Sequence, residues 1–168
     1  DLPETDPAAA EQLLDAAGWT KNAAGIREKN GETLNFRITY IDNFGPNSDS
    51  IALLQQQLEA IGIGSEQISG TVPEFLESVT SGEYEIAWRN YSSVDADVLR
   101  IDFSDDATTG WPVSDSGLNE RLVDQIGIGD PKARSRELAE LQEALIAGHH
   151  FVPVHELSSV LGTAPGVE

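Results

Sequence analysis

Strand-like and helix-like segments alternate over residues 34–91, and this order constrains the fold more than any other feature of the chain. Apolar and polar side chains alternate strictly in residues 34–40, which predicts a strand. Apolar residues recur at helical spacing in residues 51–61, and a short strand is expected over residues 63–68. The first two strands are therefore joined through a helix.

The next crossover repeats this pattern. Thr71 and Glu74 have the spacing of a capping box, and the helix that they begin is expected to end at Gly82. Residues 84–91 are predicted to form the third strand. Alternation of this kind indicates a parallel sheet with helices packed on its faces, joined by right-handed crossovers.

The second half of the chain is predicted to be mostly helical. We expect a short helix over Asp95–Asp102, capped by Asp95, another over residues 118–126, and a longer one from Pro131 to about Gly148. Residues 151–154 are expected to form a final strand at a sheet edge, since they contain a proline.

A helix with both ends encoded precedes the alternating region. Asp6 can cap its first N–H groups, Pro7 suits the first helical position, and Gly18 can end it in the left-handed conformation. The apolar stripe of this helix consists of Ala10, Leu13, Leu14 and Ala17. A turn at Asn30-Gly31 then leads into the first strand.

Composition excludes several classes of protein. The 168 residues include 29 Asp and Glu and 10 Lys and Arg, which gives a net charge of −19. Nucleic acids and anionic lipids are bound through clustered Lys and Arg, so this charge disfavours both as partners. Cysteine is absent, which excludes disulfides and thiolate metal sites. There is no apolar run of transmembrane length and no signal peptide. We expect one α/β domain over residues 1–168, and we expect this chain to be a fragment of a longer protein.

Seven groups of short motifs follow one another along nearly the whole chain. They are Asp6–Trp19 with Gly25–Gly31, Ile61–Ile63, Gly82–Ala87, Asp95–Asp97, Leu118–Asp124, Asp130–Arg134, and Leu141–Gln142 with Val152–Val154. In this order they resemble the family 5 extracellular solute-binding proteins, the peptide- and nickel-binding proteins of ABC importers.

The resemblance implies the C-terminal, distal lobe of a two-lobe, type II periplasmic-binding-protein clamp. Such a lobe is a doubly wound, mostly parallel α/β sheet with helices on both faces, and its partner lobe would be absent here. A small-molecule or peptide solute would be held between the lobes and delivered to the transmembrane subunits of an ABC permease. The protein would be periplasmic or cell-surface, lipid-anchored through the missing N-terminus, and monomeric.

Two other classes of function remain open from the residues alone. One is a stand-alone doubly wound interaction domain without a transport role. The other is a hydrolase that uses a divalent metal held by the acidic cluster around Asp95.

Ligands of open α/β sheets bind beyond the carboxyl ends of the strands. The candidate ligand-binding residues at these ends or in loops are Phe44, Trp88, Arg89, Asn90, Tyr91, Ser92, Ser93 and Trp111. Aromatic rings supply flat apolar area, Arg89 can hold a carboxylate by two hydrogen bonds, and Asn90 can orient a ligand. Alternatively, Trp88 belongs to the core, Arg89 pairs with an acid such as Asp95, and Trp111 covers the helices.

Two departures from the family pattern leave the ligand open. The loop Lys21–Ala24 lacks the Asp and Gly residues often found there, so the sequence supports no cation loop. The segment Trp88–Val94 has no acid before Asp95, although peptide binders often carry an Asp there that pairs with the peptide amine. A peptide, an opine-like compound, a sugar and a metal complex all remain candidates.

The sequence contains no recognisable motif for a metal site or for enzyme catalysis. His149-His150 with His155-Glu156 matches no compact zinc signature, and the acids from Asp95 to Asp106 lack the pattern of an EF-hand loop. There is no nucleophile turn and no phosphate-binding glycine loop. We therefore expect no metal, no cofactor, no catalytic residues and no enzyme activity.

Overall fold

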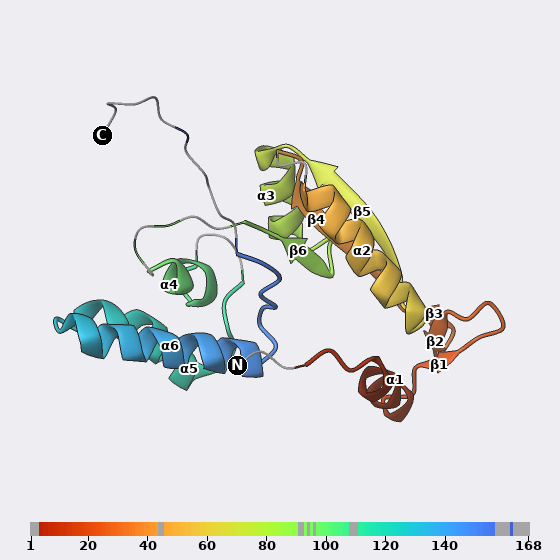
Figure 1. The fold of residues 1–168 in the computed structure, drawn as a ribbon, viewed down its shortest axis with the longest axis horizontal. Coiled ribbons are helices and arrows are strands. Elements are labelled where there is room, and N and C mark those ends of the chain that lie inside the picture. The colour runs from red at the N-terminus through yellow and green to blue at the C-terminus, as the bar shows by residue number, and fades with distance from the viewer. Residues whose placement is uncertain are drawn as a thin grey trace. The chain divides into compact units, whose positions relative to one another are not determined.

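Three parallel strands form the main sheet of the protein in a computed structural model (Figure 1). β4 (Asn35–Ile41) lies between β5 (Gly64–Gly70) and β6 (Ile86–Trp88). β5 pairs with β4 along its whole length, and β6 pairs with residues 38–40 of β4. The structure describes residues 4–43, 46–90, 93, 95, 97–107, 111–156 and 162.

The chain divides into two compact units, residues 1–123 and 124–168. The main sheet belongs to the first unit. The expectation of a single lobe over residues 1–168 remains a prediction.

The sheet is doubly wound about its central strand. α2 (Pro46–Ala60) connects β4 to β5, and α3 (Val72–Ser81) connects β5 back across β4 to β6. Because the two crossovers run in opposite directions along the sheet, right-handed connections place the two helices on opposite faces. The predicted order of strands and helices over residues 34–91 is confirmed. The helix expected over residues 51–61 begins earlier, at Pro46, and the strand expected over residues 84–91 is limited to Ile86–Trp88.

The core explains why burial in β4 does not alternate as its sequence does. Ile38, Tyr40, Ile51 and Trp88 form one buried cluster, and half-buried Leu54, Leu58 and Ile86 pack against it. Thr39 is also buried, although it points to the opposite side of the strand from Ile38 and Tyr40. A central strand covered by a helix on each face is expected to bury both sets of side chains.

A small antiparallel sheet precedes the main one. β1 (Thr20–Lys21), β2 (Arg27–Lys29) and β3 (Glu32–Thr33) pair in chain order. Asn30 and Gly31 both have positive φ, 55° and 87°, as the tight turn of a hairpin requires. The turn was predicted, but the short strands on either side of it were not.

α1 (Pro7–Ala16) is capped as predicted, because the Asp6 carboxylate accepts a hydrogen bond from Ala9 N–H at 2.9 Å. Gly18 has a φ of +86° and ends the helix as expected. The apolar stripe of this helix is not buried, since α1 has no buried residue and Leu13 is 72% exposed. The contacts of α1 with the buried Arg27 guanidinium are polar, through Asp15 and Glu11.

The helices of the second half lie close to their predicted positions. α4 (Val98–Phe103) begins after Asp97 rather than at Asp95, and α5 (Ser116–Asp124) continues into a short 3-10 helix, η1 (Gln125–Gly127). α6 (Pro131–Ala147) begins after a capping Asp130, and it buries Leu138, Leu141 and Leu145.

The strand expected at residues 151–154 is absent: residues 151–156 are described as neither helix nor strand, and Val152 is 80% exposed. A strand exists only with a partner to which its backbone can bond. Within the described part of the chain, no helix has the length and apolarity needed to cross a membrane.

Candidate functional site

The carboxyl ends of the three parallel strands lie at one edge of the sheet, where ligands of doubly wound folds bind. An open hollow of about 420 Å³ lies at the ends of β4 and β5. It is lined by Ile41, Asp42, Asn43, Ser69, Gly70, Thr71, Val72 and Glu74. The hollow is thus formed by two strand ends and the first turn of α3.

The first turn of α3 fixes one charge beside this hollow. Glu74 Oε2 accepts hydrogen bonds from the backbone N–H and the hydroxyl of Thr71, both at 2.7 Å. These bonds, the backbone one first, lower the pKa of Glu74. The predicted capping box is therefore present, and it keeps an ionised carboxylate at the rim.

The end of β6 is held to α2 through Asn47. Trp88 Nε1–H and Asn90 Nδ2–H both donate to Asn47 Oδ1, at 3.2 and 3.1 Å. Asn47 is 3% exposed and Trp88 is 8% exposed. Trp88 is thus a core side chain with its one polar group bonded inside the protein, which agrees with the alternative interpretation of this residue.

Arg89 directly follows β6 and bonds to other partners than Trp88 and Asn90 do. Its Nη1 donates to the carboxylate of Asp102, which is 1% exposed, at 3.2 Å. Its guanidinium carbon lies 5.4 Å from the ring centroid of Trp111, within the range of a cation–π contact. Arg89 does pair with an acid, but the acid is Asp102 rather than Asp95.

Trp111 is itself fixed by neighbouring groups. Its indole Nε1–H donates to the Tyr84 hydroxyl at 2.7 Å, and Val113 N–H donates to the Phe103 carbonyl at 2.8 Å. The Arg89 guanidinium lies between the Asp102 carboxylate and the Trp111 indole, and 28% of the Arg89 side chain is exposed to solvent. Such an arrangement can hold a carboxylate or another anionic group of a ligand.

The structure brings four of the predicted site residues together in two clusters. Trp88 and Asn90 meet at Asn47, and Arg89 and Trp111 meet each other. Ser93 is exposed, and its hydroxyl donates to the Asp95 carbonyl at 2.7 Å. Phe44, Tyr91 and Ser92 lie outside the described residues.

Sequence reasoning missed three side chains of these clusters: Asn47, Tyr84 and Asp102. Neither Asn47 nor Tyr84 was proposed as a site residue from the sequence, and Asp102 was considered only as one of the acids from Asp95 to Asp106. A polar residue in the first turn of the helix after β4 is the signal that could have indicated Asn47.

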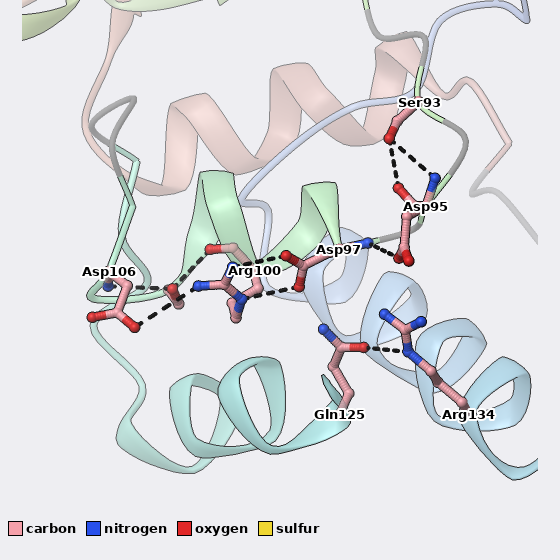
Figure 2. A network of polar contacts seen from close by, with 8 residues as sticks. Ser93, Asp95, Asp97, Arg100, Asp106, Gln125 and Arg134 are labelled. Carbon is pink, nitrogen blue, oxygen red and sulfur yellow. Dashed lines mark hydrogen bonds and ion pairs between the residues drawn. The ribbon is translucent and has the colours of Figure 1, made fainter. Parts of the chain in front are cut away.

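The acidic cluster that follows β6 is organised by hydrogen bonds within the protein (Figure 2). Arg100 donates to both carboxylate oxygens of Asp97, at 2.9 and 2.7 Å, and this hydrogen bonding raises the pKa of Arg100. Asp106 approaches the same guanidinium at 3.9 Å, and Asp95 accepts a hydrogen bond from Asp97 N–H at 2.9 Å. Figure 2 also shows Arg134 donating to Gln125 in the second unit, at 2.9 Å.

Among the described residues, no three His, Asp or Glu side chains gather closely enough to hold a metal ion. The acids near α4 are instead arranged around one arginine and backbone N–H groups. The predicted cap by Asp95 is not observed, because α4 begins after Asp97, whose side chain makes no capping hydrogen bond, and Asp102 is buried.

Comparison with known proteins decides the family. Residues 1–105 match the family described as Bacterial extracellular solute-binding proteins, family 5 Middle. The chain belongs to this family. The resemblance inferred from the seven groups of motifs is therefore confirmed, and proteins of the family bind solutes rather than catalyse reactions.

Relatives of this family 5 chain are considerably longer than it is. Protein XP55 from Streptomyces lividans is 25% identical over 158 residues, which cover 88% of this chain and 28% of that protein. NikZ from Campylobacter jejuni, solved in complex with Ni(L-His), is 25% identical with a TM-score of 0.69, over 85% of this chain and 30% of NikZ. The chain thus spans less than a third of the length of these relatives.

A further solved structure supports the fold alone, because its identity is lower. A periplasmic oligopeptide-binding protein from Thermotoga maritima, bound to mannohexaose, is 20% identical with a TM-score of 0.75. The matched region covers 89% of this chain and 30% of that one. The predicted fold class, a mixed α/β domain with a parallel sheet flanked by helices as in periplasmic binding proteins, is confirmed.

Proposed function

We propose that this chain forms one face of a solute site, and that a second lobe outside the chain forms the other face. The observation that carries the proposal is Arg89, a partly exposed cation held between Asp102 and Trp111 beyond the carboxyl end of β6. In a doubly wound fold this edge is where a ligand binds, and membership of the family makes that ligand a solute.

Closure of two lobes around the solute would produce the form that an ABC permease recognises, outside the cytoplasm. A hinge motion of this kind works by population shift, because the solute binds the closed form better than the open one. The proposed site needs both faces, so this chain alone is expected to bind weakly. The protein would act as a monomer at the cell surface or in the periplasm.

The chemistry of the site favours a solute that carries an anionic group. The guanidinium of Arg89 matches a carboxylate in shape as well as in charge. The solved structures of similar fold contain Ni(L-His), mannohexaose and a nonapeptide, so this fold is compatible with metal complexes, sugars and peptides. Metal complexes and peptides carry carboxylates and are the preferred candidates for this chain.

The test begins with the full-length protein encoded by the gene. Native mass spectrometry of the purified protein identifies any solute that is carried through purification. Calorimetry then measures binding of a fixed panel: nickel with L-histidine, the peptide Ser-Thr-Ser-Ala, and mannohexaose. We expect at least one compound of the panel or one carried-over solute to bind.

Two charge variants test the role of Arg89. Arg89→Met is expected to lower affinity for a carboxylate solute about tenfold or more, the magnitude of one lost charged hydrogen bond. Arg37→Met is the matched control, because Arg37 pairs with Glu85 toward the amino ends of the strands and is expected to leave affinity unchanged. Equal affinity of the wild type and Arg89→Met would refute the proposed site.

The isolated chain provides a second test. The half-site proposal predicts much weaker binding by this chain than by the full-length protein. Sub-micromolar binding by the isolated 168-residue chain would show that one lobe suffices, and would refute the proposal.

A further inference from the structure

We infer that Asn47 is a positioning residue for the proposed site, because its side-chain amide sets the orientation of the Trp88–Asn90 segment that leaves β6. The inference rests on the proposed function and extends it to a residue that is buried away from the ligand. Asn47 would affect binding through Trp88 and Asn90.

The geometry of Asn47 joins three parts of the sheet edge. Asn47 is the second residue of α2, and its Nδ2–H reaches the carbonyl of Ile41, the last residue of β4, at 3.5 Å. Its Oδ1 accepts the hydrogen bonds from Trp88 and Asn90. One buried amide therefore connects the first turn of α2 with the ends of β4 and β6.

The donors determine how this amide is oriented. An indole N–H can only donate, so the atom of Asn47 that faces Trp88 must be the oxygen. The same oxygen accepts a hydrogen bond from Asn90, two residues further along the chain. Loss of this one atom would remove a hydrogen bond from two side chains at once.

Asp102 holds the residue between these two donors. Arg89 lies between Trp88 and Asn90 in the chain, and its guanidinium is bonded to the Asp102 carboxylate. The segment that carries Arg89 is thus held by the Asn47 amide through Trp88 and Asn90 and by Asp102 through Arg89 itself. Removal of the amide contacts would loosen the backbone on both sides of Arg89 in the chain.

Loss of this acceptor is expected to affect stability as well as site geometry. A leucine of similar shape at position 47 can fill the same space, but it leaves the buried donor of Trp88 without this acceptor, which lowers stability. A lower melting temperature therefore does not distinguish a positioning role from a structural one. The orientation of Trp88 and the affinity for solute are the readouts that do.

The experiment uses the full-length protein labelled with ¹⁵N in the tryptophan indole groups. The Trp88 signal is assigned by its loss in Trp88→Phe, and affinity is measured for the compound of the panel that the wild type binds. Asn47→Leu removes the acceptor, and Asn47→Asp keeps an acceptor oxygen. The control is Gln55→Leu, which removes an amide of α2 that bonds to Ser65 and Gln67 instead.

Asn47→Leu is expected to shift the Trp88 indole signal and to lower affinity about tenfold, the equivalent of one or two lost hydrogen bonds. Asn47→Asp is expected to restore both readouts toward the wild type. Gln55→Leu is expected to lower the melting temperature while the Trp88 signal and the affinity stay unchanged. If Asn47→Leu does not fold, Trp88→Phe, which removes the same bond from its other end, is expected to reduce affinity in the same direction.

Any one of three outcomes would refute the inference. The first is an unchanged Trp88 signal in Asn47→Leu. The second is a shifted Trp88 signal with wild-type affinity in that variant, and the third is an equal loss of affinity in Gln55→Leu and Asn47→Leu. Absence of wild-type binding to every solute would instead refute the proposed function. The indole signal needs no ligand, so it decides in either case whether Asn47 orients Trp88.

Discussion

Replacement of Arg27 by methionine probes the contact that joins the first helix, the small sheet and the turn after α2. The side chain of Arg27 is 2% exposed, and its Nε–H donates to the Ile61 carbonyl at 2.7 Å. Its Nη1 donates to the Trp19 carbonyl at 2.7 Å and to the Asp15 carboxylate at 2.6 Å. Methionine has a similar length and can fill the space, but it donates no hydrogen bond.

The expected cost follows from these three bonds. Each of the two carbonyls loses a charged donor, and such a bond contributes about 1.5–3 kcal/mol. The bond to Asp15 adds little, because that carboxylate is 63% exposed and water can replace the arginine. The buried guanidinium also no longer has to be desolvated, which offsets part of the loss. We expect a net decrease of about 3 kcal/mol in the free energy of unfolding.

Urea unfolding followed by circular dichroism measures this decrease, and thermal unfolding should show a melting temperature lower by about 6–12 °C. Arg37→Met is the control, because it removes an exposed pair with Glu85 and should have a much smaller effect. A free energy of unfolding for Arg27→Met within about 0.5 kcal/mol of the wild type, the range of ordinary surface substitutions, would refute the reasoning.

Two further predictions concern the turn after α2 and the pH dependence of stability. Gly62 has a φ of +87°, and a Cβ there would lie 2.8 Å from the Gly25 carbonyl oxygen, so Gly62→Ala should lower the free energy of unfolding by about 2 kcal/mol. An unchanged urea midpoint would contradict this. Hydrogen bonding to Arg37 lowers the pKa of Glu85 in the folded protein. The ionised Glu85 therefore stabilises the fold at pH values above the ordinary glutamate pKa of about 4.3. This stabilisation is lost as the pH falls through the lowered pKa of the folded protein. Glu85→Gln should therefore flatten the loss of stability in acid, and parallel curves for variant and wild type would count against this assignment.

Local patterns were sufficient to predict most of the first unit. The capping box at Thr71 and Glu74 and the hairpin turn at Asn30-Gly31 depend on residues a few positions apart, and both are present. The order of strands and helices along the chain, and with it the parallel sheet, also follows from local periods. What these patterns share is that the interacting groups are neighbours in the chain.

Predictions that depended on distant partners were less successful. The strands of the small sheet contain two or three residues, too few to show a period. The apolar residues at 151–154 resemble a strand in isolation, but Val152 and Val154 are exposed. The stripe on α1 has the spacing of a buried face, yet its helix is joined to Arg27 through charged groups.

The candidate site also combines features set by local sequence with contacts between residues far apart in the chain. The sequence by itself determined the family, the alternation of strands and helices, and the placement of Trp88, Arg89 and Asn90 near the carboxyl end of a strand. Only the tertiary structure decided that Trp88 bonds to Asn47, 41 residues earlier in the chain, and that Arg89 bonds to Asp102. The physical reason is that a residue type limits which bonds a side chain can make, whereas the packing of sheet and helices selects the partner that lies within reach.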